Sequence, residues 1–132
     1  MNLYEPQDAD ETSELVAMTY EEYLERKEVF EAQVEISDAA RKLATIPEFE
    51  LVVMNAYFTE EPRRLGALMA SGKLAQKNFD NCAHDLQAIA HFRNFLKEQL
   101  ERGNLARNEL DSLQEAYDEA VTSGAMNPSS MN

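Results

Sequence analysis

Apolar residues recur at steps of three and four positions along most of the chain, and this spacing is typical of amphipathic helices. The longest unbroken run predicts a helix over about residues 75–102. Ala83 and Ala90 widen its apolar stripe, and Arg93 is the one charged residue in it. The stripe itself consists of Phe79, Cys82, Leu86, Ile89, Arg93, Leu96 and Leu100.

A further run follows at once and predicts another helix, with the stripe Ala106, Leu110, Leu113, Tyr117 and Ala120. Gly103-Asn104 separates the two runs and reads as a C-cap followed by an N-cap, so we expect a break there. The alternative is one long helix, because Leu100, Gly103, Leu110, Tyr117 and Val121 also keep a helical period.

The first helix is predicted to begin at Thr19, which with Glu22 has the spacing of a capping box. Tyr20, Tyr23, Phe30 and Val34 then form a seam like that of a coiled coil, with Lys27 at one of its positions. The rest of this helix is rich in glutamate. A helix with so narrow an apolar stripe packs on one neighbour only, or pairs with another chain.

A second capping box, Thr45 with Glu48, predicts a helix that starts near residue 46. Its expected buried face is Phe49, Val52, Val53 and Ala56, and the other apolar residues around it indicate contact on more than one side.

Pro62 lies inside this predicted helix, where a proline removes a backbone hydrogen bond and clashes with the preceding turn. Either the helix kinks there, or a new helix begins with Pro62 in its first turn. Gly72 is suited to a left-handed C-terminal cap.

These patterns predict an all-α fold, a small hairpin or bundle of three to four helices with a long acidic first helix and disordered termini. We expect an acidic flexible arm over residues 1–17, a single helical domain over 18–122 and a flexible tail over 123–132. Leu3 and Tyr4 are the apolar pair of the arm and are candidates to anchor it on a partner.

The formal net charge of −13 is concentrated at the two ends of the chain. Residues 1–35 carry eleven acids and two bases, residues 36–103 carry nine of each, and residues 104–132 carry five acids and one base. Direct binding of nucleic acid or of an anionic membrane is disfavoured, since both require a basic patch. The acidic charge fits better with a basic partner, or with a role in solubility alone. The acidic start lacks the features of a secretion signal, no apolar run is long enough to span a membrane, and a single cysteine fits an intracellular protein.

The sequence offers no catalytic, cofactor-binding or metal-binding pattern. His84 and His91 are two helical turns apart, about 10.5 Å along the axis, so one metal ion cannot take both. Cys82 falls within an apolar stripe, where a buried structural thiol is expected. We therefore expect a protein that is not an enzyme and has no cofactor.

The candidates for a partner interface come from the terminal arm, from the seam of the first helix and from charges and aromatic residues outside the other predicted stripes. Glu60 and Arg64 are spaced to form an ion pair on a helix, as are Glu61 and Arg64. Such a pair is either a solvated surface pair or a means of holding the arginine ready for a partner's carboxylate. Aromatic residues and arginine are enriched in interface cores. The full set of interface candidates is Leu3, Tyr4, Tyr20, Tyr23, Tyr57, Phe58, Arg63, Arg64, Phe92 and Phe95.

Two stretches, "PEFELVVMNAYFTEEPRRLGALMA" and "DLQAIAHFRNFLKEQLERG", resemble short acidic helical proteins of tailed bacteriophages, including those of N4-like podoviruses. The resemblance spans about residues 40–115, and Pro62 and Gly66 depart from it. The matching positions are Pro47, Phe49, Tyr57, Phe58, Glu61, Arg64, Leu65, Phe92, Phe95, Leu96 and Gly103.

The resemblance implies a small, non-enzymatic protein made with the structural genes of a phage. The leading hypothesis is a virion structural or assembly protein, located in the virion and in the host cytoplasm during assembly. It would pack against a larger virion protein or against further copies of itself, as a head, portal or tail component or as an internal one. One alternative is an assembly scaffold or chaperone absent from the mature particle. The other is an acidic inhibitor of a host nucleic-acid enzyme that mimics DNA, although the central segment is neutral.

Overall fold

The structure, a computed structural model, describes residues 18–124, and this part of the chain is helical with no strand. The fold is therefore all-α, as predicted. The arm predicted over residues 1–17, with Leu3 and Tyr4, lies outside the described residues, as does most of the predicted tail.

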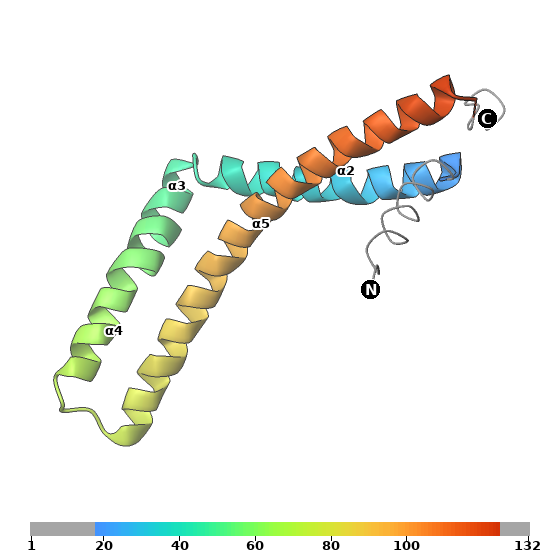
Figure 1. Ribbon diagram of the computed structural model, residues 1–132. Helices are drawn as coiled ribbons and strands as arrows, with labels where there is room; N and C mark the ends of the chain where they lie inside the picture. Colours follow the sequence, from blue (N-terminus) through green and yellow to red (C-terminus); the bar gives the residue numbers. More distant parts are fainter. Residues whose placement is uncertain (1–17, 125–132) are drawn as a thin grey trace, which may run out of the picture. The chain divides into compact units, whose positions relative to one another are not determined.

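The described chain divides into two compact units (Figure 1). One comprises residues 35–103, and the other comprises residues up to 34 together with those from 104 onward. Two helices, α2 (Tyr20–Leu43) and α5 (Gln76–Thr122), contribute residues to both units. Between them lie α3 (Pro47–Phe49), the π-helix η1 (Glu50–Glu60) and α4 (Glu61–Ala70).

Helix α2 begins as the sequence predicts, because the Thr19 hydroxyl accepts a hydrogen bond of 3.0 Å from the backbone N–H of Glu22. Acids in its first turn and Arg41 and Lys42 in its last turn both suit the helix dipole. The second predicted capping box does not form. The Thr45 hydroxyl instead donates to the carbonyl of Lys42 at 2.7 Å, and Ile46 is the N-cap of α3 without a side-chain bond.

Pro62 does not interrupt the helix that contains it. Glu60 and Glu61 both keep right-handed helical dihedral angles, and Pro62 lies in the first turn of α4. The preceding turns have π-helical hydrogen bonding, and the N–H of Glu61 donates to the carbonyl of Ala56, five residues back. This wider turn accommodates a residue that has no N–H to donate to the carbonyl four residues back. Helix α4 then ends at Ala70, and the φ of 72° at Gly72, just beyond it, confirms the predicted left-handed cap.

The predicted break at Gly103-Asn104 is wrong, because α5 runs without interruption from Gln76 to Thr122. Gly103 has a different role. A Cβ built on it would lie 2.0 Å from the Ser37 Oγ and 2.1 Å from the Ser37 Cβ, far closer than atoms can approach. Gly103 is therefore a point of close contact between α5 and α2, where Gly103 is buried and Ser37 is fully buried.

The core of the 35–103 unit forms where η1 and α4 lie beside α5 (Figure 1). Its buried residues are Phe58, Leu65, Cys82 and Ile89, and five half-buried residues pack on them, namely Val53, Met69, Leu74, Leu86 and Leu96. Cys82 is a buried free thiol, as expected. The α5 stripe is largely confirmed, although Phe79 is 38% exposed.

The predicted buried face of the second helix is partly wrong, since Val52 is 60% exposed and Ala56 is exposed. Phe58, which an α-helical period places elsewhere, is only 5% exposed. Val53 and Phe58 are five residues apart, and that spacing returns to one side of a π-helix but not of an α-helix.

The other unit has its own core, formed by Met18, Tyr23 and Leu113 with Tyr20, Phe30 and Tyr117 packed against them. The rings of Tyr23 and Tyr117 stack with centroids 4.2 Å apart, and the Tyr23 hydroxyl donates to Gln114 Oε1 at 3.0 Å. Lys27, which the sequence shows within the seam, places its Nζ 5.8 Å from the centroid of the Tyr23 ring. Ala106 and Ala120 are buried as predicted.

Candidate functional site

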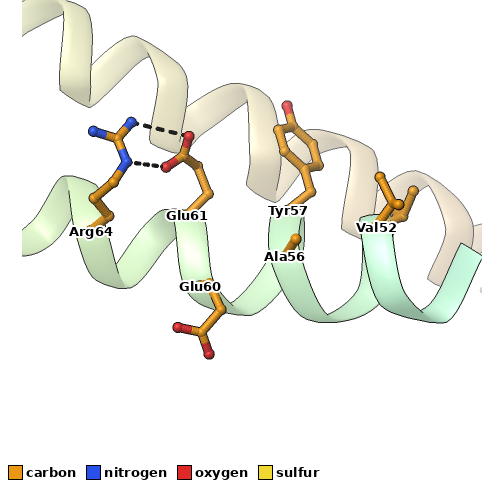
Figure 2. A pocket seen from close by; sticks show the side chains of 7 residues that line it. Val52, Ala56, Tyr57, Glu60, Glu61 and Arg64 are labelled. Carbon is orange, nitrogen blue, oxygen red and sulfur yellow. Dashed lines mark hydrogen bonds and ion pairs between the residues drawn. The ribbon is translucent and has the colours of Figure 1, made fainter.

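An open groove follows one side of η1 and the start of α4, within the 35–103 unit (Figure 2). Its volume is about 590 Å³, and its lining is apolar at one end and charged at the other. The lining residues are Val52, Val53, Ala56, Tyr57, Glu60, Glu61 and Arg64.

At the charged end, Arg64 forms a bidentate pair with Glu61 (Figure 2). Its Nη2 donates to Glu61 Oε2 at 3.1 Å, and its Nε donates to the other carboxylate oxygen. These hydrogen bonds hold the pKa of Glu61 below its ordinary value, and the carboxylate in turn raises the pKa of Arg64. The Arg64 side chain is 59% exposed, so its stabilising effect is screened by solvent.

The second anticipated pair has a different partner. Glu60 accepts a hydrogen bond from Arg63 at 3.3 Å rather than from Arg64, and both side chains are well exposed. Figure 2 shows the Glu60 side chain pointing away from the Glu61–Arg64 pair. The spacing of three residues thus accounts for both pairs, and the predicted Glu60–Arg64 pair at a spacing of four residues is absent from the described ion pairs.

Aromatic side chains connect this groove to α5. The ring of Phe92 lies 5.4 Å from that of Phe58, in an edge-to-face arrangement, and 6.4 Å from that of Tyr57. Tyr57 is 36% exposed, Phe92 37% and Phe95 48%. We call Val52, Tyr57, Phe92 and Phe95 the aromatic face, because all four are exposed apolar residues on neighbouring helices of one unit.

The remaining interface candidates are distributed differently. Phe58 and Tyr23 lie in the two cores, each 5% exposed, so each packs against residues of its own unit. Tyr20 is half-buried beside Tyr23, because both rings pack on Tyr117.

Sequence reasoning missed Val52 as a surface residue. The buried face was predicted from an α-helical period, which does not hold in the π-helix η1.

Within residues 18–124, no three histidine, cysteine or acidic side chains converge as metal ligands would. His84 and His91 are both exposed on α5. Among the described helices, none has both the length and the apolar character required to cross a membrane.

Comparison with known proteins gives no match, whether with family models, with curated protein sequences or with solved structures. The resemblance to phage proteins stays a prediction.

Proposed function

We propose that this chain is a bacteriophage virion structural or assembly protein that acts by packing against other proteins and catalyses no reaction. The observation that supports it best is the aromatic face, where the exposed ring of Tyr57 lines the same groove as Arg64 and contacts the ring of Phe92. Aromatic residues and arginine are the side chains most enriched at the centres of protein interfaces. The resemblance to short acidic phage proteins supplies the biological setting.

In this proposal the partner covers Tyr57, Phe92 and Phe95 with apolar side chains and places a carboxylate near Arg64. Arg64 already holds Glu61 in a bidentate pair, so its guanidinium is oriented before the partner arrives. The partner is a larger virion protein or another copy of the chain.

The decisive experiment is quantitative mass spectrometry of intact, purified particles of the phage that carries the gene. We expect the chain in amounts stoichiometric with the known structural proteins. Its absence from mature particles, together with its presence in immature ones, would instead assign it to the scaffold or chaperone class. Absence from both would overturn the proposal.

A double substitution on the aromatic face tests the surface itself. Phe92→Ser with Phe95→Ser should leave the helical content unchanged, because both rings are more than a third exposed, and should lower incorporation into particles. Leu105→Ser provides a matched control, since Leu105 is 65% exposed and lies in the other unit. Normal incorporation of the double variant would remove the aromatic face from the proposal.

Inhibition of a host nucleic-acid enzyme by DNA mimicry is the second candidate. It is favoured by six exposed glutamates in the first sixteen residues of α2, at positions 21, 22, 25, 28, 31 and 35. This candidate predicts binding to a polymerase or restriction enzyme that weakens steeply as salt is raised. Salt-independent binding, or none, would exclude it.

A further inference from the structure

A second groove lies in the 35–103 unit, where the end of α2, η1 and α5 meet. Its volume is about 320 Å³, and it is lined mainly by apolar side chains. The lining consists of Ala40, Ala44, Phe49, Met54, Phe58, Thr59, Arg93, Leu96, Lys97 and Leu100. Because its only charged residues are Arg93 and Lys97, we call it the basic groove.

The two cations of the basic groove are unpaired within the described part of the chain. Arg93 and Lys97 are one helical turn apart on α5 and so project from the same side of the helix. Neither forms an ion pair or side-chain hydrogen bond with any of residues 18–124. An apolar groove flanked by two unpaired cations suits an occupant that offers apolar side chains together with carboxylates.

The chain itself carries such a surface on the first part of α2, which belongs to the other unit. Leu24 and Glu28 are four residues apart, as are Glu25 and Val29, so these four share one side of the helix. Leu24 is 43% exposed and Val29 66%, and both glutamates are exposed. We call these four residues the acidic face. Its glutamates also form no ion pair within the described chain.

We infer that the basic groove of one copy receives the acidic face of α2 from a second copy of the chain. Glu25 and Glu28 would meet Arg93 and Lys97, and Leu24 and Val29 would enter the apolar part of the groove. Residues 36–103 carry nine acids and nine bases, so the unit with the groove does not repel an acidic helix despite the chain's net charge of −13.

This inference rests on the proposed function in one respect, since it specifies how a multi-copy packing protein would contact itself. The two surfaces are different, so the contact is head-to-tail. Such a contact leaves one groove and one acidic face free on each pair, and it can therefore add further copies.

Sedimentation velocity of the full chain over a range of concentrations tests the inference. We expect the wild type to self-associate. Two charge-reversal variants, Arg93→Glu with Lys97→Glu and Glu25→Lys with Glu28→Lys, should each associate at least about tenfold more weakly. An equal mixture of the two variants should associate again, because each supplies the charge that the other lost. Salt alone is a poor test, since it screens the general repulsion as well as the specific attraction.

Two controls carry the same change in net charge at other exposed positions. Lys73→Glu with Lys77→Glu matches the first variant, and Glu48→Lys with Glu50→Lys matches the second. Both should associate like the wild type, and circular dichroism should show that all variants remain helical.

A wild type that stays monomeric, variants that associate normally, or a mixture that fails to restore association would each overturn the inference. Saturable binding of dodecanoate, lost in the Arg93→Glu and Lys97→Glu variant, would assign the groove to a small anionic amphiphile instead and also overturn it. Failure here is distinguishable from failure of the proposed function. If the chain is present in particles but monomeric in solution, only the copy-to-copy contact is overturned. If the mixture of the two variants associates again but the chain is absent from particles, only the virion role is overturned.

Discussion

Single residues with unusual packing decide how closely the helices approach. Gly103 has no side chain, and Ser37 of α2 occupies the space where its Cβ would be. The Ser37 hydroxyl is fully buried and has no hydrogen-bond partner among residues 18–124, so this contact depends on small size and not on a polar interaction. The helices are thus held close at the cost of one unsatisfied hydroxyl.

Gly103→Ala should destabilise the protein by about 1–3 kcal/mol, because the new methyl group must push Ser37 aside in a packed interior. The higher helix propensity of alanine offsets only part of this loss. Gly66→Ala is the matched control, since a Cβ there meets nothing within 4 Å, and it should stabilise by about 0.5–1 kcal/mol. Urea unfolding followed by circular dichroism measures both changes. Equal effects of the two substitutions would contradict the close contact.

Ionisation of Tyr117 makes the stability of the other unit depend on pH in the alkaline range. Its burial raises the pKa of its phenol, and the neighbouring Tyr20 and Tyr23 add to the rise. The pKa is thus higher in the folded chain than in the unfolded one. The corresponding stability is fully present below the unfolded pKa of about 10 and is lost as pH rises through the folded pKa.

We therefore expect the free energy of unfolding to fall above about pH 10, and to fall less steeply in Tyr117→Phe, which has no phenol to ionise at that position. Urea titrations between pH 8 and pH 11.5 measure the slope. The same slope in both proteins would show that Tyr117 ionises equally well in the folded state.

At the scale of helices, η1 sets which side chains of residues 50–60 reach the core. Hydrogen bonding to the fifth residue back puts Val53 and Phe58 on one side and leaves Val52 outside. An α-helical register from the same starting point would bury Val52 and expose Phe58. The two registers therefore make opposite predictions for two substitutions.

Phe58→Ala should cost about 3–5 kcal/mol, because it leaves a cavity beside Leu65 and Ile89. Val52→Ala should change stability by no more than about 0.5 kcal/mol, since the side chain is 60% exposed. Thermal and urea unfolding of both variants decide between the registers. A larger loss for Val52→Ala would indicate an α-helical register.

The helices that follow a regular 3.6-residue period could be predicted from the sequence, and those that depart from it could not. The stripe from Ala106 to Ala120 was predicted in full, and the Thr19 cap was found from its local spacing. Gly103 was misread because glycine suits both a helix end and a close helix contact, and only the position of Ser37 distinguishes the two. The basic groove was not predicted, since residues from three separate segments line it.

For the whole molecule, the important feature is that each unit has its own core. The cluster around Phe58 and Ile89 and the cluster around Tyr23 and Leu113 share no residue. Most of the stability of a helix in a protein comes from the packing of its apolar face. Each unit is therefore expected to open locally when its own core is weakened, even though α2 and α5 contribute to both.

Leu113→Ala should cost about 2–5 kcal/mol in its own unit, because the side chain is 5% exposed and packs against Tyr23. Native-state hydrogen exchange should then show faster exchange for amides of residues 20–33 than in the wild type, and little change for residues 51–68. Ile89→Ala, in the other core, should give the reverse pattern. Uniformly faster exchange in both variants would mean that the two units unfold as one cooperative body, because α2 and α5 would then transmit the loss of either core along their length.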